Sequence, residues 1–152
     1  MEVKYIPGTK EELRGLIEAN VPGDQIDTRH ITDMSELFLN STYNHPIDSW
    51  DVSQVKNMNY MFYKSQYNHH LGSWDVSHVE SMDCMFARSK YNHPLGSWNT
   101  CRVQSMECTF AESEYNHPLD SWNVSCVKFY YSEPIHVFLR SQFIYPIPEF
   151  DT

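Results

Sequence analysis

The sequence predicts an α/β solenoid. Its core is a stack of four 24-residue coils, each with a short parallel strand and a short helical turn, preceded by an N-terminal strand–helix cap. The first observation is an interval of 24 residues between successive tryptophans, at Trp50, Trp74, Trp98 and Trp122. The second is that apolar residue types recur at fixed places between the tryptophans. Such a pattern is typical of a repeat whose copies bury a common core only by stacking.

Composition and charge exclude several classes of protein. The 152-residue chain has 20 acidic and 11 basic residues, a formal net charge of −9. Because phosphates would be repelled, we expect no nucleic-acid partner. No apolar run is long enough for a transmembrane helix, so we expect no membrane insertion. No signal peptide is visible, and the sequence by itself therefore indicates a cytoplasmic protein.

Residues 1–25 are expected to cap the first coil. A strand is predicted over residues 2–6. Thr9 and Glu12 then have the spacing of a capping box, which marks the start of a helix that ends near Asn20. A cap of this kind covers core that the first coil of a stack would otherwise expose to water.

The repeat region is residues 26–127, with position 1 of each 24-residue repeat at Ile26 or at a tryptophan. It comprises four complete coils and a partial fifth: 26–49, 50–73, 74–97, 98–121 and 122–127. Positions 1, 3, 6, 9, 12, 13, 18 and 22 are apolar in nearly every copy and should face the core. Positions 1 and 3 alternate as in a strand, and positions 9, 12 and 13 have the spacing of a helical turn.

Residues 128–152 are expected to form a divergent C-terminal tail or cap. Pro134 stands where the other copies have Phe at position 13, so the repeat is not expected to continue. Two interpretations stay open. The tail folds over Trp122 and Val127, or it replaces a lost coil and leaves an aromatic patch that promotes self-association.

The string W-D-V-S-x-V-x-x-M-x-x-M-F, best matched at residues 50–62 and 74–86, resembles the BspA-like leucine-rich-repeat surface-protein family. This is a short, tryptophan-bearing repeat class described as a domain of unknown function. The resemblance covers residues 26–127 and implies a leucine-rich-repeat-like stack with a parallel strand ladder. It also implies adhesion or protein contacts and a location at the cell surface.

One row of candidate binding residues follows the tryptophans at position 2: Asp27, Asp51, Asp75, Asn99 and Asn123. On a leucine-rich-repeat-like strand this position faces the concave surface. There the row would bind a basic partner or Ca²⁺. The alternative is that these side chains are turn acceptors along the coil.

Four histidines share position 20 and are expected to stack as a row: His45, His69, His93 and His117. They are weak candidates for a Zn²⁺ or Cu²⁺ site, because a line of ligands does not converge on a tetrahedral ion. Hydrogen bonding to backbone is the preferred interpretation. The four cysteines are expected to be free thiols, although Cys84 and Cys108 share a position and could approach disulfide distance.

The sequence contains no nucleophile elbow, no glycine-rich phosphate loop and no His-Glu-x-x-His motif, so we expect neither an enzyme nor a cofactor. The leading hypothesis is a non-enzymatic interaction or adhesion module that presents rows of side chains to another protein. Two alternatives stay open: a metal- or pH-responsive protein that uses the position-20 histidines, and a structural or decaying repeat fragment with no partner of its own.

Overall fold

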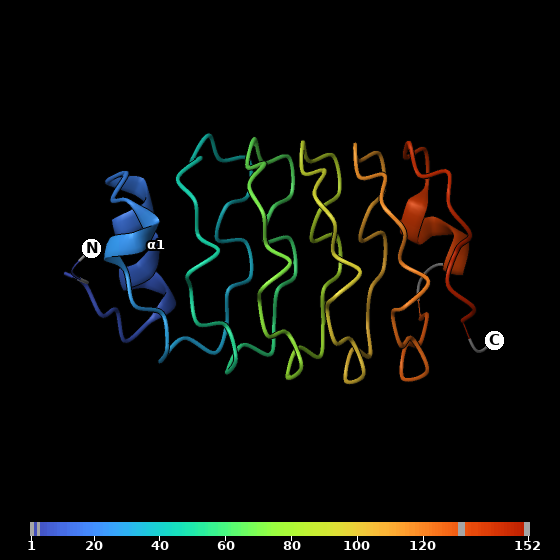
Figure 1. Cartoon of the computed structure of the whole chain (residues 1–152), viewed down its shortest axis with the longest axis horizontal. Coiled ribbons are helices and arrows are strands. Elements are labelled where there is room, and N and C mark those ends of the chain that lie inside the picture. The colour runs from blue at the N-terminus through green and yellow to red at the C-terminus, as the bar shows by residue number, and fades with distance from the viewer. Residues whose placement is uncertain (1, 3, 131–132, 151–152) are drawn as a thin grey trace.

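The computed structural model describes residues 2, 4–130 and 133–150. The coils follow one another along the long axis (Figure 1), with α1 (Lys10–Glu18) at the N-terminal end and the C-terminal tail at the other. Two short 3-10 helices, η1 (Gly23–Gln25) and η2 (Pro134–Phe138), complete the helical elements of these residues. Turns and extended segments make up the rest, so the stack is mostly irregular. None of the helices in the described chain has the length and apolarity needed to cross a bilayer.

The periodic core that the sequence predicts is confirmed. At position 13, the rings of Phe38, Phe62, Phe86 and Phe110 stack with centroids 5.2 to 5.5 Å apart and planes within 7°. Tryptophans at position 1 stack at 6.1 to 6.4 Å, and tyrosines at position 18 stack at 6.5 Å. Burial of one such side chain contributes about 1.5–3 kcal/mol, so these aromatic ladders hold the coils together.

Backbone hydrogen bonds fix the register of neighbouring coils. N–H groups at positions 9, 11, 13 and 15 donate to carbonyls at positions 8, 10, 12 and 14 of the next coil. The Met58 N–H, for example, donates to the Ser81 carbonyl at 2.9 Å, and the Lys64 N–H to the Ala87 carbonyl at 3.0 Å. Isolated parallel bridges run along position 8, through Asp33, Asn57, Ser81 and Ser105. A shift of one residue would break all of these bonds together.

The strand predicted at positions 1 to 3 is wrong, because the parallel bridges between coils lie at position 8. The one bridge at position 1 joins Ile26 to Tyr5 of the cap. Two turns flank the Trp50–Val52 segment: the Trp50 N–H donates to the Ile47 carbonyl at 3.1 Å, and the Val55 N–H to the Val52 carbonyl at 2.9 Å. Coils are joined here through side chains. The Trp74 indole N–H donates to the Ile47 carbonyl at 3.0 Å.

The helical turn predicted at positions 9 to 13 is also wrong. The Met61 N–H donates to the Met58 carbonyl at 3.2 Å and closes a turn, while the Phe62 N–H donates to the next coil. Tyr60 has a φ of 57° and Lys64 a φ of 53°, and left-handed values recur at these two positions in all four complete coils. An α-helix excludes such values. The predicted inward positions are nevertheless buried, because tandem turns satisfy the same side-chain spacing.

The N-terminal helix begins as predicted. The Thr9 hydroxyl accepts the Glu12 N–H at 3.2 Å, and the Glu12 carboxylate accepts the Gly8 N–H at 2.8 Å. Among the described residues, the strand expected over residues 2–6 is reduced to one parallel bridge between Tyr5 and Ile26; residue 3 lies outside the described part of the chain.

The C-terminal tail differs from the expectation, because it forms a further coil after a four-residue insertion. Phe138 lies 28 residues after Phe110, and the two rings stack at 5.5 Å with planes 3° apart. The Phe110 N–H donates to the Val137 carbonyl at 2.8 Å, the same contact that links earlier coils. The insertion moves Pro134 to position 9, where the other coils have Met. A search with a constant 24-residue interval therefore does not detect this coil.

Candidate interaction surface

The position-2 side chains lie on turns. The Asp51 carboxylate accepts the Ser53 N–H at 3.0 Å, and the Asp75 carboxylate accepts the Ser77 N–H at 3.0 Å. Asp27, Asn99 and Asn123 make the same bond to the residue two places ahead. The concave strand face expected for this row is therefore wrong, because no strand forms there. The hydrogen bonds match the turn-acceptor alternative.

The side chains at position 2 are exposed to solvent in every coil except the first. Asp51, Asp75, Asn99 and Asn123 are exposed, and Asp27 is half-buried. The Arg29 guanidinium, hydrogen-bonded to the Asp27 carboxylate, lowers the pKa of that carboxyl group. Hydrogen bonds from the Ser77 side chain and backbone lower the pKa of Asp75. Both carboxylates are consequently charged at neutral pH.

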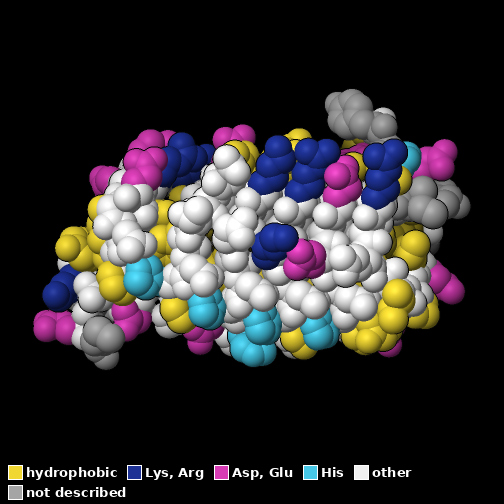
Figure 2. All heavy atoms as spheres, turned by 90° about the horizontal axis from the view of Figure 1, so that it is seen from above, with side chains coloured by type: hydrophobic (Ala, Val, Ile, Leu, Met, Phe, Trp, Pro, Cys, Tyr) yellow, Lys and Arg dark blue, Asp and Glu magenta, His cyan; other side chains and the backbone are white. Residues whose placement is uncertain are grey.

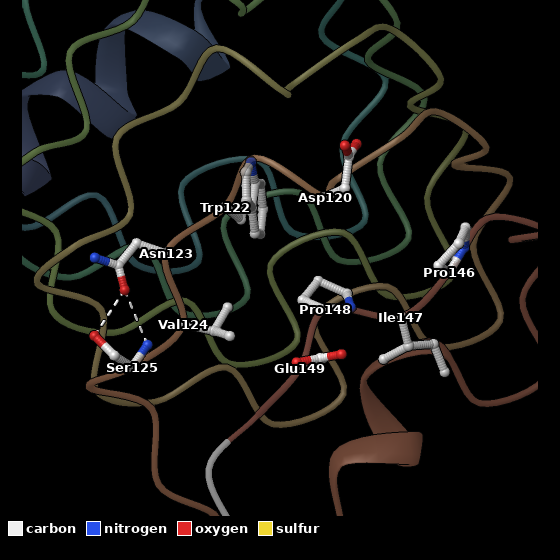
Figure 3. Close-up of a pocket in the computed structure, with 9 residues that line it drawn as sticks. All are labelled: Asp120, Trp122, Asn123, Val124, Ser125, Pro146, Ile147, Pro148 and Glu149. Atoms are coloured by element: carbon white, nitrogen blue, oxygen red, sulfur yellow. Dashed lines mark hydrogen bonds between the residues drawn. The ribbon is translucent and has the colours of Figure 1, made fainter.

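Two hollows lie along the row, one near each end of the stack. The first, of about 530 Å³, is lined by Ile26, Asp27, Asp51 and their neighbours. In the second, of about 470 Å³, the segment from Asp120 to Ser125 faces the segment from Pro146 to Glu149 (Figure 3). Carboxylates line both hollows, so each could accept a basic side chain.

Three of the four position-20 histidines contact the backbone of the preceding coil, while the His45 ring packs against the Tyr43 ring with centroids 5.2 Å apart. The His93 Nε2 atom lies 2.9 Å from the Asn68 carbonyl oxygen, and His69 and His117 make equivalent contacts at 2.7 and 3.1 Å. Because a carbonyl only accepts, Nε2 is assigned the hydrogen. Figure 2 shows histidine side chains following one another along the stack. Within the described residues, no group of three or more His, Cys, Asp or Glu side chains is placed to hold a metal ion.

A second polar row at position 19 was missed by sequence reasoning. The Asn68 side-chain carbonyl accepts the Asn92 N–H at 2.9 Å, and the Asn92 side-chain carbonyl accepts the Asn116 N–H at 2.9 Å. These side chains, like the neighbouring histidines, form hydrogen bonds from a side chain of one coil to the backbone of the adjacent coil. The signal was present, because all four complete coils have Asn here.

The four cysteines are free thiols in the structure. Cys126 is exposed and the other three are half-buried. Desolvation by burial raises the pKa of Cys84 and of Cys108. The structure therefore shows no disulfide between these two residues, although they occupy the same position of adjacent coils.

The family model described as "Mycoplasma protein of unknown function, DUF285" matches residues 11–122, from α1 to the last tryptophan. The chain belongs to this family. The DUF285 match contains four members of the position-2 row and ends before Asn123. The last coil, which follows the four-residue insertion, also lies beyond it. No curated protein and no solved structure matches the chain.

Proposed function

We propose that this DUF285 protein is a non-enzymatic interaction module of the BspA-like leucine-rich-repeat type, which binds another protein through the position-2 row. The observation that carries the proposal is the repeated Asx turn, which holds a carboxylate or amide at the same place in successive coils. This group is exposed in every coil after the first. Side chains fixed before binding lose little conformational entropy when a partner arrives.

Charge indicates the kind of partner. The pKa values of Asp27 and Asp75 are lowered, both hollows on this surface contain carboxylates, and the chain has a net charge of −9. A basic protein surface would therefore be attracted over a distance and held at the row. Adhesion to such a surface is the biological role that we infer. His69, His93 and His117 are assigned to joining the coils, because their Nε2 atoms contact backbone carbonyls.

The test uses residues that already occur at position 2 in this chain, so that the effect of charge on binding is measured without an effect on folding. Position 2 already has Asn in two coils, so Asp51→Asn with Asp75→Asn should keep both turns and remove two charges. Binding of a fluorescent ten-residue lysine-rich peptide is measured by anisotropy at low and physiological salt. We expect the double variant to bind about tenfold more weakly, a change of about 1.4 kcal/mol.

Glu18→Gln with Glu36→Gln is the matched control, since it removes two exposed carboxylates away from the row. This control should bind the peptide within about twofold of the wild-type chain. Equal losses in both double variants would show attraction to net charge alone and would overturn the proposal. Absence of peptide binding to the wild-type chain would also overturn it.

A further inference from the structure

The last coil is apolar where the other coils are polar. Position 19 is Asn in all four complete coils and Ile144 in the last, and position 20 is His in all four and Tyr145 in the last. Ile144 is 78% exposed and Tyr145 is 37% exposed. The turn of the last coil does not need Ile144 and Tyr145 in order to form, because the other coils form the same turn with Asn-His.

Three further side chains extend this apolar surface. Ile147 takes position 22, which is completely buried in the four earlier coils, yet it is 39% exposed. Leu139 is 41% exposed, and Phe143 is half-buried. All five residues line a single hollow of about 400 Å³. We call Leu139, Phe143, Ile144, Tyr145 and Ile147 the end patch.

Different elements lie at the two ends of the stack, α1 at one end and the last coil at the other (Figure 1). At the N-terminal end, α1 buries Leu13 and Ile17 and leaves Glu11 and Glu18 exposed. A terminal unit that faces water normally has such a polar outer side. The end patch has an apolar outer side, which is typical of a surface covered by a partner.

We propose that a second copy of this chain covers the end patch, so that two stacks meet tail to tail about a two-fold axis. Because α1 closes the other end, a head-to-tail contact would place the apolar patch against exposed glutamates. A two-fold contact places it against itself. Arg140 lines the same hollow, and Glu149 follows Ile147 by two residues. Both are exposed, so unlike charges can pair across the axis. Elsewhere the net charge of −9 on each copy opposes association.

The backbone of the last coil favours this side-chain contact over addition of a further coil. In the first three coils, the N–H at position 9 donates to the following coil, as the Met58 N–H does to the Ser81 carbonyl. Pro134 occupies position 9 in the last coil and has no N–H to donate. Proline at such a place is a common way to stop an edge from being extended. The contact is therefore expected to close at two copies and not to grow into a filament.

The experiment is sedimentation velocity of the full chain at physiological salt, from about 1 to 100 μM, a range suited to a micromolar dimer. We expect the wild-type mass to rise from one chain to two. Ile144→Asn with Tyr145→His restores the pair found in the other coils and should weaken the dimer at least tenfold. Its circular dichroism should stay that of the wild type, since the substituted pair already folds in this register.

Ile6→Asn is the matched control, because Ile6 is 59% exposed at the opposite end of the stack. This variant and Asp51→Asn with Asp75→Asn should both dimerise as the wild type does, which keeps the result independent of the position-2 row. A wild-type chain that stays monomeric overturns the proposal, as does dimerisation that persists when the end patch is made polar. Growth beyond two copies, or loss of the dimer in Ile6→Asn, would indicate head-to-tail contact and also overturn it.

Discussion

The Tyr115 hydroxyl accepts a hydrogen bond from the Leu95 N–H at 3.2 Å, which joins one coil to the coil before it. The same contact recurs at 3.2 Å in the two preceding pairs of coils. In the last coil, Phe143 occupies the place of the tyrosine and stacks on Tyr115 at 6.4 Å, but it has no hydroxyl to offer to Leu119. Position 18 therefore supplies one fewer hydrogen bond at the C-terminal end.

Phe143→Tyr should raise the free energy of unfolding by about 1 kcal/mol, the usual net value of one hydrogen bond. Tyr91→Phe should lower it by about 1–2 kcal/mol, because the buried N–H of Leu71 loses its acceptor. Urea denaturation of the dilute chain measures both changes. Tyr145→Phe, which removes an exposed hydroxyl, serves as the control and should change little. A Phe143→Tyr chain no more stable than the wild type would contradict the equivalence of the coils.

The periodicity of the sequence identified the core because it reports the environment of each side chain. Trp98, Phe86 and Tyr91 are buried as the repeat predicts. The local backbone was not predictable in the same way. The spacing of Met58, Met61 and Phe62 fits a helical turn and a pair of tandem turns equally well, and it does not reveal that N–H groups bond to the next coil. The residue types at position 11 do not indicate the left-handed backbone either. The positive φ values there occur at Glu36, Tyr60, Cys84 and Cys108, and none of these residues is glycine.

The candidate surface was predictable as a row but not in its local conformation. Stacking by a fixed period necessarily places Asp51 beside Asp75, so the row could be read directly from the sequence. Whether it lies on a strand or a turn depends on backbone bonds that the period does not encode. The end patch was hidden for another reason. A four-residue insertion moves Phe138 and Phe143 out of phase, and only a gap restores their match to Phe110 and Tyr115.

Alkaline pH should unfold the stack through its tyrosines. Burial raises the pKa of Tyr43 to about 12 and also raises the pKa of Tyr67, Tyr91 and Tyr115. Below the unfolded value of about 10, the phenols are protonated in both states and the stabilisation is complete. Above it, only the unfolded chain ionises readily, so stability falls as pH rises towards the folded pKa.

Tyrosinate absorbance at 295 nm and far-ultraviolet circular dichroism, followed together, test this expectation. The buried tyrosines should ionise only as the dichroism is lost. Tyr91→Phe should make the decline of stability above pH 10 less steep, because it removes one of the linked groups. Complete tyrosinate absorbance in a chain with native dichroism would contradict the burial of these phenols.

The left-handed backbone at Lys64 should reverse the usual preference for alanine over glycine. Lys64 has a φ of 53°, and a β-carbon in this region costs about 1 kcal/mol. Lys64→Gly is therefore expected to be more stable than Lys64→Ala by about that amount. Both variants lose the contact of the Lys64 ammonium with the Tyr63 ring, so it cancels in the comparison.

Gln66 is the matched site, exposed in the same coil and without a positive φ. There the glycine variant should be less stable than the alanine variant by about 0.5–1 kcal/mol. Thermal melts of the four variants measure the two differences. An advantage of alanine at both sites would mean that position 15 does not adopt the left-handed turn.

Thiol reactivity should follow burial along the chain. Cys126 is exposed, whereas burial raises the pKa of Cys84 and Cys108 and so lowers their thiolate fraction at neutral pH. Titration of the native chain with a chromogenic disulfide reagent should therefore show one fast phase, which Cys126→Ser removes. In denaturant, four thiols should react in the wild-type chain and three in the variant. Only two reactive thiols in the denatured wild-type chain would show a disulfide and contradict the free pair at Cys84 and Cys108.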